Sequence, residues 1–270
     1  MSVSELLEPD PNEPLALAAF ARTAPGAYAD HRCLALEFSS RGDRVLGQLV
    51  MPDAPSPPLI VLAHGLGSSR NQDGMDTIGA RWVREGAAVA SIDFALHGER
   101  ANPKFSERLS QTAASALSGR FERPADEMLW SEFVRQSVLD LRRLVDAVEH
   151  LGEVDTHRFV YVGFSLGGML GAIFCGVDPR PRGAALVIAG SGESGAPLDP
   201  NRYVAQISPR PVLMVNASHD ETVSREATER LFAAARDPKQ IEWYEAGHRT
   251  LPGAAMKAVW RFSAPLLERP

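Results

Sequence analysis

Short runs of apolar residues recur along the chain. Residues 59–63 (LIVLA) form one such run, and similar runs follow at 87–92, 159–164, 184–189 and 212–215, with a less apolar one at 241–244. Strands that are buried on both faces of a parallel sheet have this pattern. We therefore expect these runs to form the centre of a sheet.

Helical patterns lie between the apolar runs. The clearest is a set of apolar residues spaced by three or four positions, which therefore share one face of a helix: Val134, Val138, Leu141, Val145 and Val148. Upstream, residues 33–38 and 45–51 have a strand pattern and flank a polar turn, which predicts an antiparallel hairpin. An initial hairpin followed by alternating strands and helices predicts a mostly parallel sheet with helices on both faces.

Two segments depart from this alternation. Residues 15–21 (LALAAFA) are apolar but too short to span a membrane, so we expect a helix there and treat residues 1–30 as an N-terminal helical extension. Residues 98–130 lack a strong apolar period and are too long for a plain connector. They are predicted to form a cap insertion within the main domain, 31–270, although a surface excursion remains the alternative.

Composition limits the partners of the protein. The formal net charge is -6, so no basic face is expected for nucleic acid. The acidic N-terminus is unlike a secretory signal, and two cysteines are far fewer than disulfide-rich secreted domains carry. We expect a cytoplasmic protein that binds neither nucleic acid nor membrane. A homodimer is left open.

A nucleophile motif lies at residues 163–168 (GFSLGG). It follows the apolar run at 159–164 and precedes a helical pattern, which is the context that a G-x-S-x-G elbow requires. Glycines at 163 and 167 would relieve collisions in such a tight turn. Ser165 is therefore the predicted nucleophile, and a plain glycine-rich turn is the alternative.

A serine hydroxyl needs a base to take its proton. His248 follows the run at 241–244, which places it at the same sheet edge as Ser165. Asp220 follows the run at 212–215 and is the predicted acid that orients the imidazole. Its neighbour Glu221 remains an alternative acid.

The loop HGLG at residues 64–67 follows the first apolar run. In acyl transfer two backbone N–H groups hold the developing oxyanion, and we expect them to be those of Leu66 and Leu166. The loop lacks the third glycine of a dinucleotide-binding fingerprint. His64 and His97 have no second ligand at helical spacing, so no metal and no cofactor is expected.

A substrate pocket is expected between the cap and this edge. Its predicted lining is one loop residue and four large side chains of the cap: His64, Phe105, Phe121, Met128 and Trp130. Ordinary packing of the cap on the domain is an equally good explanation of the four cap residues.

Together these motifs resemble the α/β-hydrolase superfamily and, within it, the dienelactone-hydrolase-like and small serine esterase group. The resemblance covers about residues 33–262. It rests on HGLG at 64–67, DFALHG at 93–98, the elbow at 163–168, HD at 219–220 and GH at 247–248. It implies the α/β-hydrolase fold with eight strands, no metal and no organic cofactor, and structural roles for Asp93 and His97. Enzymes that act on dienelactone carry cysteine at the nucleophile position, where this chain has Ser165, so dienelactone is not the expected substrate.

The expected function is hydrolysis of small to medium-sized carboxylic esters through an acyl-enzyme on Ser165. Thioesterase, lactonase and acyltransferase activities remain alternatives, because the same residues leave the leaving group and the acceptor open. A non-catalytic ligand-binding module on this fold is the alternative from another class. Such a module is expected to lack one of the three catalytic residues.

Overall fold

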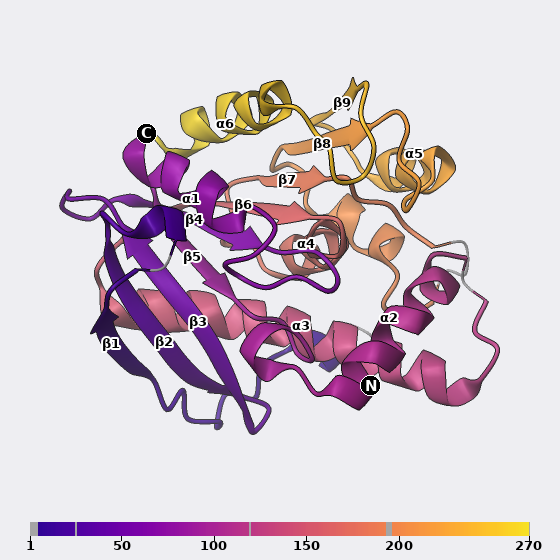
Figure 1. The fold of residues 1–270 in the computed structure, drawn as a ribbon, viewed down its shortest axis with the longest axis horizontal. Helices are drawn as coiled ribbons and strands as arrows, with labels where there is room; N and C mark the ends of the chain where they lie inside the picture. Colours follow the sequence, from indigo (N-terminus) through magenta and orange to yellow (C-terminus); the bar gives the residue numbers. More distant parts are fainter. Residues whose placement is uncertain (1–4, 25, 119, 193–195, 270) are drawn as a thin grey trace.

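The computed structural model describes residues 5–24, 26–118, 120–192 and 196–269. A nine-stranded sheet with the order β1-β2-β3-β5-β4-β6-β7-β8-β9 runs through its centre (Figure 1). The strands are β1 (Ala18–Arg22), β2 (Arg32–Ser40), β3 (Asp43–Met51), β4 (Pro58–Ala63), β5 (Ala88–Ile92), β6 (Asp155–Phe164), β7 (Ala184–Val187), β8 (Val212–Ala217) and β9 (Lys239–Tyr244). Pairings among β1, β2, β3 and β5 are antiparallel, and those from β5 to β9 are parallel. The predicted mostly parallel sheet is confirmed.

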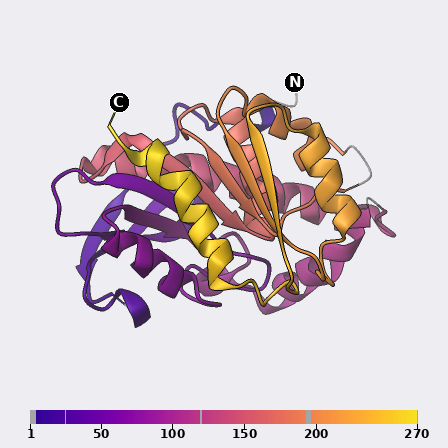
Figure 2. The same ribbon diagram turned by 90° about the horizontal axis from the view of Figure 1, so that it is seen from above.

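Helices cover both faces of the sheet (Figure 2). One face carries α1 (Met75–Arg84) and α6 (Gly253–Leu267), and the other carries α3 (Pro124–Leu151), α4 (Leu166–Val177) and α5 (Arg225–Ala234). Five short 3-10 helices are η1 (Glu5–Leu7), η2 (Gly26–Tyr28), η3 (Gly98–Arg100), η4 (Pro200–Arg202) and η5 (Val204–Gln206). None of the helices in the described ranges is both long and apolar enough to cross a lipid bilayer.

The predicted helix at residues 15–21 is wrong. Residues Ala18–Arg22 form β1, which pairs antiparallel with β2 and places Phe20 opposite Ala35. β1 adds a ninth strand to the eight that the family resemblance implied. The physical reason is that the open edge of β2 offers backbone partners to this segment, and those partners outweigh its local preference for helix. Residues 1–4 and 25 of the predicted extension lie outside the described residues.

The predicted cap, residues 98–130, is mainly helical. It contains η3, the helix α2 (Pro103–Ser118), which packs on α3, and the first turns of α3. Only Leu109 and Thr112 of α2 are buried, which explains the weak apolar period of this segment. Two nitrogens of Arg108 contact Asp126 at 2.5 to 2.7 Å and join α2 to α3. Gly119 lies outside the described residues.

The parallel strands all end at one edge of the sheet. Because β4, β6, β7, β8 and β9 run in the same direction, the loops that follow them meet at their carboxyl ends. Ser165 lies directly after β6, and the loops that carry Asp220 and His248 follow β8 and β9. The topology thus brings together residues that are far apart in the sequence.

Candidate active site

Ser165 occupies a sharp turn between β6 and α4. Its backbone has φ 52° and ψ -115°, a strained conformation for a residue with a side chain. A Cβ atom at Gly163 would collide with the backbone of Gly167, and one at Gly167 would collide with the backbone of Ala63. The Ser165 N–H donates to the carbonyl of Val187 at 2.8 Å. The predicted strand–turn–helix geometry is therefore present.

The structure brings Ser165, His248 and Asp220 into hydrogen-bond contact. Nε2 of His248 lies 3.0 Å from Oγ of Ser165. Nδ1 of the same ring lies 2.9 and 2.7 Å from the two carboxylate oxygens of Asp220. The side chains of His248 and Asp220 are only 11% and 6% exposed, so little water competes for these contacts.

The environment of Asp220 keeps it ionised. Burial acts to raise the pKa of its carboxyl, but the hydrogen bonds from His248 and from the N–H groups of Val223 and Thr222 outweigh burial and lower the pKa. An ionised carboxylate only accepts hydrogen bonds, so Nδ1 of His248 carries the proton that the two groups share. Nε2 is then left to accept a proton from Ser165.

Glu221, the alternative acid, contacts the backbone of His248 and not its ring. Its Oε2 accepts the His248 N–H at 3.2 Å. The pKa of the exposed Glu221 carboxyl is lowered by this bond and by its own backbone N–H. This geometry leaves Asp220 as the carboxylate that orients the imidazole.

The loop after β4 packs against Ser165. A Cβ atom at Gly65 would lie 3.4 Å from Cβ of Ser165. Within the described part of the chain, the N–H of the next residue, Leu66, has no hydrogen-bond acceptor. The N–H of Leu166 lies in the first turn of α4, where helices leave N–H groups unpaired and favour negative charge. Both predicted oxyanion donors are thus available beside Ser165.

His64 is buried behind this loop, so its predicted place in the substrate pocket is corrected. Its Nε2 accepts the N–H of Phe94 at 3.1 Å, and its Nδ1–H donates to the carbonyl of Gly65 at 2.8 Å. Burial lowers the pKa of His64 to about 3, so the ring is neutral. Because a trans peptide points its C=O and N–H in opposite directions, the Leu66 N–H is turned away from the imidazole.

A buried ion pair joins the loop after β4 to the loop after β5. The guanidinium of Arg70 contacts Asp93, and these side chains are 5% and 1% exposed. Asp93 also accepts the N–H groups of Arg70 at 2.9 Å and Glu99 at 3.0 Å. His97 is buried nearby and bonds the carbonyl of Ala95. The sequence indicated no role for Arg70, because its partner Asp93 lies in the loop after a different strand.

The cavity beside Ser165 and His248 is lined by residues that the sequence analysis missed. Its volume is about 430 Å³, and its apolar walls are Met75, Ile78, Ile188, Leu251 and Met256. They lie on α1, directly after β7, in the loop before α6 and on α6 itself. None belongs to a recognisable motif, and no signal in the sequence could have identified them.

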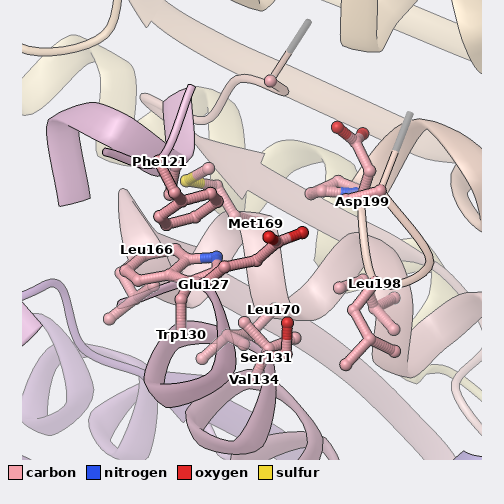
Figure 3. Close-up of a pocket in the computed structure, with 15 residues that line it drawn as sticks. Phe121, Glu127, Trp130, Ser131, Val134, Leu166, Met169, Leu170, Leu198 and Asp199 are labelled. Carbon is pink, nitrogen blue, oxygen red and sulfur yellow. The ribbon is translucent and has the colours of Figure 1, made fainter. Parts of the chain in front are cut away.

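A second, narrower cavity of about 40 Å³ lies under the cap. Figure 3 shows Phe121 and Trp130 on one side of it and Leu198 and Asp199 on the other. Leu166 lines this narrow cavity, and its chain neighbour Ser165 lines the large one. Phe121 and Trp130 therefore line a cavity next to the site, but neither lines the one that contains Ser165.

The predicted pocket roles of Phe105 and Met128 are corrected. These side chains are 50% and 68% exposed, and they line neither cavity. The reason is the orientation of their helices, since the inward faces carry buried residues such as Leu109 of α2 and Phe133 of α3. Within the described ranges, no group of three or more His, Cys, Asp or Glu residues is arranged to hold a metal ion.

Comparison with known families identifies the chain. The family model of acetyl xylan esterases (AXE1) matches residues 21–188, more than half of the 270 residues. The chain belongs to the acetyl xylan esterase (AXE1) family. The predicted α/β-hydrolase superfamily and fold are thereby confirmed, and the AXE1 family is one of carboxylic ester hydrolases.

Solved structures share the AXE1 fold. Acetyl xylan esterase 1 from Thermoanaerobacterium sp. JW/SL YS485 superposes with a TM-score of 0.75 at 17% identity, over 98% of this chain and 92% of that one. A candidate dienelactone hydrolase from Klebsiella pneumoniae subsp. pneumoniae MGH 78578 superposes with a TM-score of 0.65 at 17% identity, over 94% of this chain and 100% of that one. The uncharacterized protein YfhR of Escherichia coli O157:H7 is 25% identical over 118 residues, 38% of this chain. The matched segment spans 42% of YfhR.

Proposed function

We propose that this protein hydrolyses carboxylic esters of small to medium size through an acyl-enzyme on Ser165. The observation that carries the proposal is the continuous contact from Asp220 through His248 to the Ser165 hydroxyl. A hydroxyl is a weak nucleophile at neutral pH, and an imidazole in this position removes its proton as attack begins. Asp220 orients the ring of His248 so that Nε2 faces the Ser165 hydroxyl, as this step requires.

In the first half of the reaction, Oγ of Ser165 bonds to the carbonyl carbon of the ester and its proton moves to Nε2 of His248. The carbonyl oxygen becomes an oxyanion, which the N–H groups of Leu66 and Leu166 stabilise. The tetrahedral centre then collapses: the bond to the alcohol oxygen breaks, and His248 returns the proton to that oxygen. The products are a free alcohol and an acylated Ser165.

In the second half, a water molecule attacks the acyl carbon and His248 takes one of its protons. Collapse of this second tetrahedral centre breaks the bond to Oγ of Ser165, which recovers the proton from His248. The products are the carboxylic acid and the free enzyme. Asp220 stays ionised throughout and stabilises the imidazolium that forms twice in each cycle.

Acetate esters of sugars are the first substrates to test. Both the family and the Thermoanaerobacterium neighbour are described as acetyl xylan esterases. The narrow cavity beside Leu166 also favours a short acyl group, because it holds only about 40 Å³. Thioesters, lactones and transfer to another acyl acceptor use the same acyl-enzyme and belong in the same panel.

The deciding experiment compares the wild type with Ser165→Ala on acetylated sugars and on p-nitrophenyl esters of increasing chain length. Turnover by the variant is expected to fall by at least about 10⁴-fold, as when the nucleophile of a serine hydrolase is removed. Ser110→Ala, on the exposed face of α2, is the matched control and keeps full activity. Equal turnover by Ser165→Ala and wild type contradicts the proposal.

A fluorophosphonate label separates this enzyme from a ligand-binding module of the same fold. Folded wild type is expected to be labelled at Ser165, whereas Ser165→Ala stays unlabelled. Folded wild type that neither takes up the label nor releases acid from any ester, thioester or lactone of the panel supports the binding module instead.

A further inference from the structure

Ile188 has an unusual backbone conformation next to the nucleophile. It directly follows β7 and has φ 46°, in the left-handed region. It is the only β-branched residue with positive φ among the described non-glycine residues. A branched side chain is a genuine outlier there, because its Cβ crowds the backbone. Glycine would adopt the same conformation without this strain.

The peptide group between Val187 and Ile188 is held by a hydrogen bond on each side. The carbonyl of Val187 accepts the N–H of Ser165 at 2.8 Å, and the N–H of Ile188 donates to the carbonyl of Val215 at 2.7 Å. This one peptide therefore links the nucleophile elbow to β8. Its plane cannot rotate to relieve Ile188 without breaking one of the two bonds.

The chain that leaves Ile188 is held as firmly. The carbonyl of Ala189 accepts the hydroxyl of Thr228 at 3.1 Å, and the N–H of Ser191 donates to the carbonyl of Ala227 at 3.1 Å. Both partners lie on α5. Strained backbone persists where the surroundings over-determine it, and such positions cluster at functional sites.

The Ile188 side chain forms a wall of the 430 Å³ cavity that also contains Ser165 and His248. It is 7% exposed, so a small apolar surface faces the cavity and the rest is packed. The strained backbone thus places a bulky, stiff side chain beside the atoms that would react.

The position of His248 decides which part of an ester lies in this cavity. A tetrahedral centre on Ser165 has four substituents: Oγ, the oxyanion, the leaving oxygen and the acyl chain. The leaving oxygen must come within hydrogen-bond reach of Nε2 of His248 to receive its proton. His248 and its loop, including Leu251, line the large cavity and do not line the narrow one.

We propose that Ile188 is a specificity-determining residue for the leaving alcohol, which lies in the 430 Å³ cavity against Ile188, Leu251 and Met256. The inference rests on the proposed function. The acyl chain points to the side of Leu166, toward the narrow cavity lined by Met169 and Trp130. Ile188 therefore limits the bulk of the alcohol and not the length of the acid.

The test uses two substrate series and follows acid release. One series keeps the acetyl group and enlarges the alcohol from methyl to isopropyl, cyclohexyl and benzyl. The other keeps methanol and lengthens the acid from acetate to butyrate and hexanoate. In Ile188→Gly, the ratio of kcat/KM for cyclohexyl over methyl acetate is expected to rise at least roughly tenfold, the lower end of the effect of one methylene group in an apolar pocket. The ratio for methyl hexanoate over methyl acetate stays within about twofold of wild type.

Trp130→Ala is the matched control on the other side of the nucleophile, and it is expected to change the acid series and leave the alcohol series unchanged. Ile188→Val, which keeps most of the packed side chain and removes one methylene group, replaces the glycine variant if that variant does not fold, and a smaller rise of the same ratio is then expected. An unchanged alcohol ratio in the folded variant, or an equal rise in the acid ratio, overturns the assignment of Ile188. Loss of the proposed function itself has a different signature, since Ser165→Ala would then match wild type on both series.

Discussion

Both carboxylate oxygens of Asp220 contact Nδ1 of His248, at 2.9 and 2.7 Å, while the adjacent carboxylate of Glu221 bonds the backbone of His248 and not its ring. Two neighbouring acids therefore hold one residue in different ways. Asp220 sets the tautomer and the tilt of the ring, and Glu221 positions the loop that carries it. The two functions predict different losses when each acid is replaced by its amide.

Asp220→Asn is expected to reduce the rate of acylation by about 10³- to 10⁴-fold, because an amide does not hold the required tautomer or stabilise the imidazolium. Glu221→Gln keeps an oxygen acceptor for the His248 N–H. Its rate of acylation is expected to fall by less than about tenfold, which corresponds to the free energy of one exposed hydrogen bond. Single-turnover kinetics with a p-nitrophenyl ester measures both. A larger loss in Glu221→Gln than in Asp220→Asn would reverse the assignment of the acid.

His64 predicts a specific dependence of stability on pH. Because burial lowers its pKa from the ordinary 6.5 to about 3, the unfolded chain binds a proton below about pH 6.5 that the folded chain refuses. The contribution of His64 is therefore complete above pH 6.5 and is lost as the pH falls toward 3, by up to about 1.4 kcal/mol per pH unit. His64→Asn, which keeps a donor and an acceptor, removes this dependence.

Urea unfolding of wild type and His64→Asn at pH 7, 6 and 5 measures the pH dependence of stability that His64 contributes. The free energy of unfolding of the wild type is expected to fall more steeply with decreasing pH than that of the variant. Only the difference in slope matters, so a constant loss of stability in the variant does not affect the result. Parallel pH profiles for the two proteins would rule out a neutral, buried His64.

Strain at Ile188 predicts that Ile188→Gly is more stable than Ile188→Ala, the reverse of the usual order of glycine and alanine. Both Ile188→Ala and Ile188→Gly lose the packed side chain, but only alanine keeps a Cβ in the left-handed region. The glycine variant is therefore expected to be more stable than the alanine variant by about 1 kcal/mol, after glycine's extra chain entropy is subtracted from the relief of strain. Ala90→Gly, in the middle of β5, is the control. At this ordinary strand position the glycine variant is expected to be less stable than the protein with alanine. Thermal or urea unfolding of the two Ile188 variants decides the point, and an alanine variant that is the more stable refutes strain at this position.

The Arg70–Asp93 pair predicts a large effect of a conservative replacement. Asp93→Asn leaves the guanidinium of Arg70, 5% exposed, with only the exposed carboxylate of Glu99 as an ionic partner, and is expected to lower the free energy of unfolding by about 3 kcal/mol. Glu153→Gln breaks the exposed pair with Arg32, whose side chain is 57% exposed, and is expected to lower it by less than about 1 kcal/mol. Equal losses measured by urea unfolding would show that burial does not distinguish the two pairs.

Central strands were predictable because burial on both faces leaves a continuous apolar run, as at 59–63 and 159–164. β1 was not predictable. It is an edge strand of five residues, and it forms only because β2, elsewhere in the chain, offers a partner. β7 was expected to reach residue 189, but it ends at Val187. There the strained turn at Ile188 leads the chain toward α5.

The convergence of Ser165, His248 and Asp220 was predictable, since each residue follows an apolar run whose end lies at the same sheet edge. The cavity walls were not predictable. Met75, Leu251 and Met256 reach the site from α1 and from the segment around the start of α6, and nothing in their local sequence distinguishes them from core residues.

By itself, the order of residues determined the alternation of strand and helix, the tight elbow around Ser165 and the loops that could supply a base and an acid. These depend on backbone sterics and on local periodicity, which act between near neighbours. Only the tertiary structure decided which carboxylate meets the imidazole, how Arg70 is neutralised and where the cavity beside Ser165 lies. Those outcomes depend on distances between loops that are separated by tens of residues, and packing of the whole sheet sets such distances.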